Sequence, residues 1–435
     1  MLVVLLLLCL LFSLLTISEQ HPTGAAAAEA LFEQLSAAGI TDRTILIAAR
    51  TDHEDSLFAG SLREMLSKKG FSRVEVVQGD PSTLRENLAG RPVSSTRVDI
   101  VATTQALAPI VETIKNQLPA LNSAEVVTPQ SSRWPTFLLA DNLRNVANQI
   151  TVIAIIAIGM TMVIIAAGID LSVGSLIALS AVVTAWLIGR LGGENASAGA
   201  MFLGSVGGVL VCGATGAFSG LMITRFRIPP FIATLAMMQV AAGVAYIVSQ
   251  GRPIYQIPES FVTLGRGSDP LLHLPYAVIL MFVLYAVAHV VMSQTTMGRY
   301  IYAVGGNSEA ARLAGIRVRW VLFAVYVICG LLAGLGGVIM ASQLKSGAPT
   351  YGLSYELYVI AAVVVGGTSL TGGEGRILGT LIGAFVIGVV QNGMNLTNVE
   401  TYTQKVVLGL IILGAVLLDR LKHQGFHWRK QRPQA

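Results

Sequence analysis

VIIAAGIDLSVGSLIALSAVV, residues 163–183, places one carboxylate, Asp170, between two apolar runs. An acid is costly in a membrane segment, so it has either a function or a local partner there. Gly168 and Gly174 interrupt the apolar pattern, which predicts a helix break followed by a new helix N-terminus. At such a terminus Asp170 or Ser172 can accept hydrogen bonds from unpaired backbone N–H groups as an N-cap. The alternative for Asp170 is a gate or a subunit contact.

A second stretch, VGGTSLTGG at residues 365–373, resembles AAGIDLSVG at residues 166–174. Each has a glycine, a short polar residue, a leucine, a hydroxyl residue and a glycine, and each separates two apolar runs. The match indicates duplicated halves, a common transporter feature, although two glycine-rich turns can also match by chance. The candidates for helix breaks or a gate are Gly168, Asp170, Ser172, Gly174, Gly367, Ser369 and Gly373, with Thr368 and Thr371 as further cap candidates.

The composition indicates a membrane protein. The 435 residues are 53% hydrophobic and only 12% charged, and the mean hydropathy is +0.67, which is too apolar for an ordinary soluble protein. A helix needs roughly 17–25 apolar residues to cross a bilayer. We expect an all-α polytopic membrane protein with about ten transmembrane helices, several of them short enough to be tilted, broken or re-entrant. The apolar runs are 2–17, 150–167, 173–188, 200–223, 231–248, 276–292, 321–340, 358–365, 377–390 and 406–418.

The basic residues of the loops indicate the sidedness of these spans. Short loops rich in Lys and Arg stay on the cytoplasmic side, and a cytoplasmic C-terminus places most loop cations there. The inner set is Arg225, Arg227, Arg299, Arg312, Arg317, Arg319, Arg376, Arg420, Lys422, Arg429, Lys430 and Arg432, and the outer set is Arg190, Arg252, Arg266, Lys345 and Lys405. The net charge of +5 therefore reflects membrane topology, and we expect no nucleic-acid partner.

The acidic residues gather near the N-terminus. Of 24 Asp and Glu residues, 15 lie at or before Asp141, which leaves 24 − 15 = 9 for the rest of the chain. Between residues 26 and 127 the runs TILIAA, VEVVQ, VDIVA and AEVV alternate with amphipathic helical stretches, which predicts a small parallel sheet. We expect an inserted extracytoplasmic α/β domain over residues 19–135. Ligands of such sheets bind at the carboxyl ends of the strands, although polar loop residues gather there in any case. The residues at these ends are Thr51, Asp52, Gly79, Asp80, Thr103 and Thr104.

The first apolar run can be a retained span or a signal peptide. AAAA at residues 25–28 offers small residues for cleavage. However, a signal peptide requires a Lys or Arg before its apolar run, and none precedes this one. We therefore expect a transmembrane helix over residues 1–18. After the insert, the helical membrane body covers residues 136–422, and a basic cytoplasmic tail covers residues 423–435.

The sequence contains no pattern typical of an enzyme or of a bound cofactor. It lacks GxxxxGK[ST], so the chain cannot bind ATP through a Walker loop of its own. Cys9, Cys212 and Cys329 lie in apolar runs without metal-ligand spacing. The spans contain almost no acids besides Asp170, which disfavours an ion-coupled carrier because no relay is visible. If the chain takes part in active transport, the ATP-hydrolysing subunit is a separate protein.

The longest inner loop is SQTTMGRYIYAVGGNSEAARLAGIRVRW, residues 293–320. Within it SEAARLAG can form a short helix with Ser308 as the N-cap and Gly315 at the end. Such a helix at the membrane surface fits a cleft on a soluble subunit, whereas the alternative is a basic connector that only sets topology. The contact candidates are Gly306, Asn307, Glu309, Ala310, Ala311, Arg312, Leu313, Gly315 and Ile316.

Five stretches resemble one family in the same order: AGIDLSVGS, RIPPFIATLAMM, SQGRPIY, MGRYIYAVGGNSEAARLAGI and GGTSLTGGEGRILGTLIGAFVIGVVQNGMNL. They are similar to the membrane permease of bacterial ABC importers for ribose and related simple sugars, over residues 137–421. The resemblance implies an inner-membrane permease that forms a homodimer or heterodimer. It also implies a cytoplasmic ABC ATPase that holds ATP-Mg and contacts residues 306–316, and an extracytoplasmic sugar-binding protein on the side of loop 250–272. The sugar path would lie between the permease subunits.

Two features depart from the family and leave alternatives open. Ala242 precedes Gly243 where the family often has an arginine, and the insert is not part of the usual permease. The insert can help dock a binding protein or can be a spacer. The polar candidates for the path are Thr234, Gln239, Gln391 and Asn392, each of which can instead form an interhelical hydrogen bond. The alternative functions are a permease for a nucleoside, a branched-chain amino acid or another small solute, an ATPase-independent secondary transporter or channel, and a receptor that senses with the insert.

Overall fold

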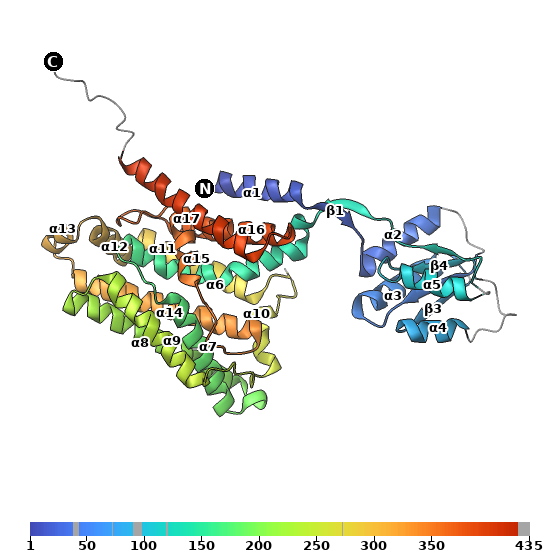
Figure 1. Cartoon of the computed structure of the whole chain (residues 1–435), viewed down its shortest axis with the longest axis horizontal. Helices are drawn as coiled ribbons and strands as arrows, with labels where there is room; N and C mark the ends of the chain where they lie inside the picture. The colour runs from blue at the N-terminus through green and yellow to red at the C-terminus, as the bar shows by residue number, and fades with distance from the viewer. Residues whose placement is uncertain (38–42, 72, 90–97, 119–120, 272, 425–435) are drawn as a thin grey trace, which may run out of the picture. The chain divides into compact units, whose positions relative to one another are not determined.

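The computed structural model describes residues 1–37, 43–71, 73–89, 98–118, 121–271 and 273–424 (Figure 1). The chain divides into a helical unit of Met1–Thr16 and Phe137–Ala435 and an α/β unit of Ile17–Thr136. Most of the expected basic tail and Leu272, the last residue of the expected outer loop, lie outside the described residues.

The α/β unit contains a four-stranded parallel sheet with helices on both faces. All five residues of strand β2 (Ile45–Ala49) are buried, because a strand covered on both faces exposes neither set of side chains. The sheet order is β3-β2-β4-β5, in which β3 is Val74–Gln78, β4 is Ile100–Thr103 and β5 is Glu125–Val127. Helices α2 (Gly24–Ala37) and α3 (His53–Lys68) pack on one face, and α4 (Pro81–Ala89) and α5 (Ala108–Gln117) on the other. The four predicted strand runs are confirmed as strands, and their pairing is parallel.

Two elements of this unit were not predicted from the sequence. AAAA, residues 25–28, lies inside α2, where Ala27 and Ala28 are fully buried in the core of the unit. Strands β1 (Ile17–Gln20) and β6 (Ser132–Pro135) form an antiparallel ribbon, which the alternating pattern of the sheet did not reveal. The ribbon brings the two ends of the α/β unit together, so the chain enters and leaves the unit at one point.

Among its described residues, the helical unit contains seven helices that are long and apolar enough to cross a membrane. They are α6 (Ala140–Ile165), α7 (Val173–Arg190), α8 (Ala198–Phe226), α9 (Pro230–Ser249), α11 (Tyr276–Gln294), α14 (Val318–Leu344) and α16 (Ile377–Leu396). Three further helices have shorter apolar segments: α1 (Leu2–Leu15), α15 (Tyr355–Val365) and α17 (Thr401–Gln424). The described residues thus form a polytopic helical membrane protein, and the expected count of about ten spans stays a prediction.

Small residues allow the central helices to approach closely. On α8 they recur every fourth position at Gly204, Gly208, Cys212, Gly216 and Gly220. A Cβ atom on Gly208 would lie 2.8 Å from the Ser180 carbonyl oxygen of α7, and one on Gly216 would overlap the Tyr326 carbonyl of α14. Close backbone approach of this kind drives helix association in lipid, where the hydrophobic effect supplies little. Helices α7, α8 and α14 therefore pack closely against one another, and α6 is the most buried of the seven long apolar helices in the described residues.

The chain between α14 and α15 returns into the unit without a helix. A Cβ atom on Gly347 would lie 2.6 Å from Ala185 Cβ, and one on Gly352 would lie 2.8 Å from Ile177 Cβ, so this segment runs along α7 toward its N-terminus. We call residues 345–354 the re-entrant segment. Helix α15 has 11 residues and is roughly 16 Å long, about half of a bilayer core. Irregular backbone at membrane depth occurs where protein buries it or where it lines a cavity.

Candidate functional site

Helices α6 and α15 end in the same backbone geometry. In each, a residue with positive φ terminates the helix, Ala167 at 61° and Gly367 at 90°. Two amides then donate back to the last turn, as in a Schellman motif. The N–H groups of Ala167 and Gly168 donate to the carbonyls of Ile164 and Val163, each at 2.9 Å, and those of Gly367 and Thr368 donate to the carbonyls of Val364 and Val363 at 2.9 and 3.2 Å. The two breaks therefore share geometry, and Ala167 is structurally equivalent to Gly367. The match between the two sequences instead aligns Gly168 with Gly367, so the two alignments differ by one residue.

The two breaks and the inner loop contact one another. The N–H of Gly373 donates to the carbonyl oxygen of Ile165 at 2.8 Å. The Tyr302 hydroxyl donates to the Gly375 carbonyl at 2.8 Å. A Cβ atom on Gly305 would overlap the Ile165 carbonyl oxygen and would lie 2.7 Å from the Gly373 nitrogen. We call residues 165–168, 302–306 and 372–375 the break junction.

Asp170 is fully buried in the first break. Its Oδ1 accepts hydrogen bonds from the backbone N–H of Ser172 at 2.9 Å and from the Ser172 hydroxyl at 2.6 Å. Helix α7 begins at Val173 with Ser172 at the N-cap position and no side-chain cap, so the prediction of an Asp170 N-cap is wrong. Asp170 instead holds the turn that precedes the helix. Its Oδ2 and the Tyr326 hydroxyl are buried without a hydrogen-bond partner among the described residues, which is unusual for native polar atoms.

The second break contains no helix cap from its hydroxyl residues. Helix α16 begins at Ile377, and its N-cap position is Arg376 with no side-chain cap, so the capping predictions for Thr368, Ser369 and Thr371 are wrong. The hydroxyls of Ser369 and Thr371 instead hydrogen-bond each other at 2.9 Å. The physical reason is that a glycine-rich turn separates these residues from the start of the helix.

The inner loop forms two short helices, α12 (Thr296–Gly306) and α13 (Ser308–Leu313), at one end of the helical unit (Figure 1). The predicted N-cap at Ser308 is wrong by one residue, because Asn307 Oδ1 accepts from the N–H groups of Glu309 and Ala310 at 3.1 and 2.9 Å. Gly315, with φ of 85°, follows the end of α13 as predicted.

Helix α12 is anchored in the unit, whereas α13 presents an accessible surface. Gly298, Ile301 and Val304 of α12 are buried. On α13 the Leu313 side chain is 80% exposed, and Arg312 forms an exposed ion pair with Glu309 at 2.7 Å. A single exposed leucine is normal on a protein surface, so α13 is accessible but does not by itself mark a binding site.

Cavities lie on both sides of α12. One, of about 430 Å³, is lined by residues 166–168 of the first break, residues 304–308 of the inner loop, and Tyr326. The other, of about 740 Å³, is lined by Arg299 and Tyr302 of α12 and by residues 375–379 after the second break. Each cavity therefore lies between α12 and one of the two breaks.

The four polar path candidates lie in separate places. Gln239 is exposed on α9 and lines a third cavity, of about 220 Å³. Thr234 is buried on the same helix, and its hydroxyl donates to backbone carbonyls. On α16, Asn392 exchanges amide hydrogen bonds with Asn142 of α6 at 3.1 and 2.9 Å, and Gln391 is half-buried. The structure thus gives Asn392 an interhelical partner and does not bring the four side chains together.

Glu356 is a candidate that the sequence pattern did not single out. It lies in the first turn of α15, is half-buried, and lines the same cavity as Gln239. The signal in the sequence was an acid directly before an apolar run, YELYVIAAVVV. An ionisable residue at such a position is a functional candidate.

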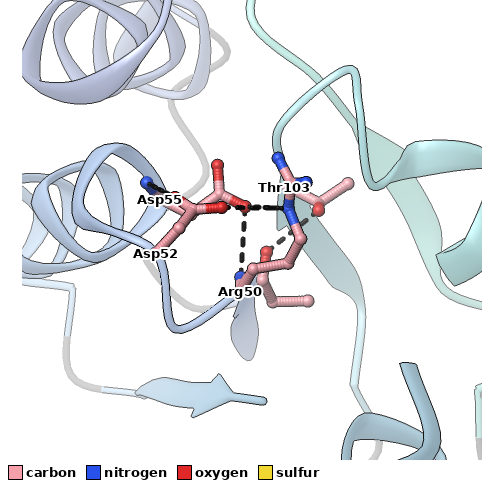
Figure 2. Close-up of polar contacts among 5 residues, drawn as sticks. Arg50, Asp52, Asp55 and Thr103 are labelled. Carbon is pink, nitrogen blue, oxygen red and sulfur yellow. Dashed lines mark hydrogen bonds and ion pairs between the residues drawn. The ribbon is translucent and has the colours of Figure 1, made fainter. Parts of the chain in front are cut away.

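The α/β unit has its own polar cluster at the carboxyl ends of β2 and β4 (Figure 2). Asp55, 4% exposed, accepts hydrogen bonds from the Arg50 backbone N–H at 3.1 Å and from Arg50 Nε at 2.9 Å. This hydrogen bond raises the pKa of Arg50 above its ordinary value. Asp52 caps α3, and Thr103 donates to the Ala48 carbonyl. These groups satisfy one another, so the cluster stabilises the β2–α3 loop, and a ligand at these strand ends stays a prediction.

The chain is a multi-pass membrane protein whose two related helix breaks both contact the loop helix α12, as in membrane transport proteins built from broken helices. Residues 142–416 match the family described as branched-chain amino acid transport system / permease component, and the chain belongs to this family.

Curated relatives match the helical unit over most of their own length. The chain is 44% identical over 297 residues to the ribose import permease protein RbsC of Escherichia coli (strain K12), covering 67% of this chain and 89% of the relative. It is 43% identical to RbsC of Bacillus subtilis (strain 168), covering 66% and 87%. It is 40% identical to the L-arabinose ABC transporter permease protein AraH of Azospirillum brasilense, covering 66% and 82%. No solved structure matches the chain.

Proposed function

We propose that this chain is the membrane permease subunit of an ATP-driven ABC importer that moves a simple sugar such as ribose across the bacterial cytoplasmic membrane. The observation that carries the proposal is the break junction, where the inner loop contacts both helix breaks. The ribose and arabinose permeases among the relatives supply the substrate class. ATP-Mg binds to a separate ATPase subunit, and this chain is not an enzyme.

In this mechanism the ATPase binds α13 through Leu313 and the charged residues beside it. Closure of the ATPase dimer around ATP moves α13, and α12 transmits the movement to Ile165 and Gly373 in the break junction. The ends of α6 and α15 then shift together, which changes the permease between outward-facing and inward-facing states. Sugar shifts this equilibrium only as far as its affinities for the two states differ.

A second permease subunit covers α9 in the assembly that we propose. Only 22% of the apolar stretch of α9 is buried within the chain. Its exposed surface is not purely apolar, because it includes the polar side chains of Gln239 and Tyr246. A polar amide is costly against lipid, and such side chains face a bundle interior or water. The sugar path would therefore lie beside α9, between the two permeases.

The α/β unit lies on the extracytoplasmic side in the proposed topology, where an extracytoplasmic sugar-binding protein delivers its cargo. The excess of loop cations on the opposite side supports this orientation. Cysteines introduced at Lys68 of the α/β unit and at Glu309 of α13 test it in a background where the native cysteines are replaced. A membrane-impermeant maleimide should label intact cells at position 68 only, and labelling at position 309 alone would reverse the orientation.

Reconstitution tests the function itself. The tagged chain is purified from its native membrane with retained partners, identified by mass spectrometry, and placed in liposomes that contain ATP. We expect a Walker-motif ATPase among the partners and uptake of labelled D-ribose that stops when the ATPase lysine is mutated. Uptake without any ATPase would favour a secondary transporter. Binding of a sugar by the α/β unit without flux would favour a receptor, and uptake of a nucleoside in place of sugars would correct the substrate class.

A further inference from the structure

The third cavity of the helical unit, of about 220 Å³, carries an inference about where the solute binds. Three parts of the fold enclose it: the first turns of α7, the middle of α9, and the re-entrant segment with the start of α15. Its volume corresponds to about seven waters at the density of the liquid. The cavity therefore accommodates a small polyol.

Polar groups from all three parts line this cavity. Ser175 comes from α7 and Gln239 from α9, and Thr350 and Ser354 come from the re-entrant segment. The re-entrant segment is not helical, and part of its backbone is paired locally, as in the hydrogen bonds from the Tyr351 N–H to the Ala348 carbonyl at 3.2 Å and from the Tyr355 N–H to the Gly352 carbonyl at 3.0 Å. Small-molecule sites are typically concave surfaces with a few convergent polar groups of this kind.

Glu356 provides the charged group of the cavity. Among the described residues, no other side chain forms a hydrogen bond or an ion pair with its carboxylate. A Cβ atom on Gly174 would overlap this carboxylate, so the glycine at the start of α7 leaves the space that Glu356 occupies. The lack of a side chain at position 174 thus leaves room for a half-buried acid beside the cavity, whose carboxylate is bonded by its own backbone and by no other side chain among the described residues.

We propose that this cavity is a sugar-binding subsite of the permease, in which Glu356 accepts hydrogen bonds from two neighbouring hydroxyls and Gln239 binds a third. This inference rests on the proposed function and names its site within each subunit. A carboxylate has two acceptor oxygens and no donor when ionised, which suits a vicinal diol. The amide of Gln239 both donates and accepts, so it binds a hydroxyl in either orientation. The exposed position of Gln239 on α9 places the subsite at the proposed boundary between two permeases.

Transport by the reconstituted complex tests the subsite. Glu356→Gln and Gln239→Ala should each lower ATP-dependent uptake of D-ribose at least fivefold, because hydrogen bonds to a charged group are about twice as strong as neutral ones. Glu356→Asp should retain more uptake than Glu356→Gln. The matched control is Glu400→Gln, an exposed acid outside the cavity, which should leave uptake unchanged. Each variant must still copurify with the ATPase at wild-type yield.

A chemical measurement decides the question if Glu356→Gln fails to assemble. Thr350→Cys, in a background without the native cysteines, should react with a small water-soluble thiosulfonate, and D-ribose should slow the reaction at least twofold while sucrose should not. No protection by D-ribose, or wild-type uptake in Glu356→Gln, would overturn the subsite. Absence of ATP-dependent sugar uptake by the wild-type complex would instead contradict the proposed function, so the two failures are distinguishable.

Discussion

Gly305→Ala is the sharpest test of the break junction, because the neighbouring Gly306 provides a matched control. A Cβ atom on Gly305 would overlap the carbonyl oxygen of Ile165 and would lie 2.7 Å from the nitrogen of Gly373. A Cβ atom on Gly306 would have no heavy atom within 4 Å. Both glycines belong to α12. The two substitutions therefore change helix propensity alike and differ in the contact that they create.

The magnitude follows from three contributions. The atoms that the new methyl group at position 305 would meet are backbone atoms, which cannot rotate away, and overpacking costs about 1–3 kcal/mol. Separation of the segments also breaks the hydrogen bond from Gly373 to Ile165, a loss of about 1 kcal/mol. Alanine favours a helix over glycine by about 1 kcal/mol, which offsets part of this. The closed junction should thus lose about 1–3 kcal/mol, equivalent to a 5- to 150-fold change in the equilibrium that couples the sites.

The assay compares sugar uptake with ATP hydrolysis in liposomes that contain the permease and its ATPase. Gly305→Ala should lower uptake per ATP hydrolysed at least fivefold, and Gly306→Ala should have the smaller effect, because its new methyl group meets no heavy atom of this chain within 4 Å. Equal and full uptake by both variants would show that the contact at Gly305 does not carry the coupling. Equal loss in both would assign the effect to the backbone of α12 rather than to the junction.

Three further outcomes are expected. Gly216→Leu should prevent assembly of α8 with α14, seen as loss of monodisperse protein in detergent. Gly409→Leu on α17, with open space around its Cβ, should not; equal behaviour would contradict close packing. Asp170→Asn should keep the acceptor for Ser172 and hence the fold and transport, and loss of transport in a stable Asn variant would show a role beyond the turn. Asp170→Ala should lower the thermal midpoint of unfolding, because it leaves the two buried donors of Ser172 unpaired at a cost of about 1–3 kcal/mol for each. Asp55→Asn should speed proteolysis of the α/β unit in the full chain, since it weakens the charge-assisted hydrogen bond with Arg50, worth roughly 1.5–3 kcal/mol. The matched substitution at the exposed Asp80, Asp80→Asn, should not change the rate, and equal rates for the two variants would refute the role of Asp55.

The sequence was informative where one local pattern decides the structure. The strand β2 was predicted from an uninterrupted apolar run, because a strand covered on both faces has no polar side. The end of α13 at Gly315 was predicted because glycine adopts positive φ without strain. The two breaks were located by their glycines and by the apolar runs that they separate.

The parts that were missed depend on contacts between distant segments. Asp170 was expected to cap a helix, but the start of α7 is set by packing, which leaves Asp170 to bind Ser172 two residues away. The hydrogen bond between Gly373 and Ile165 joins two breaks that are far apart in the chain, and no local pattern encodes it. Glu356 was overlooked because its importance comes from the re-entrant segment, whose composition resembles that of any loop.

The ribbon of β1 and β6 also bears on how a transporter acquires new parts. Its strands pair Ile17 with Pro135 and Gln20 with Ser132, so two four-residue strands hold both ends of the α/β unit side by side. A chain with this geometry needs only a short hairpin in place of residues 21–131 to join β1 to β6. Evolution could add the extra domain in one recombination event without disturbing the order of the membrane helices. For the same reason, an engineer could exchange the domain for a reporter protein whose termini lie close together.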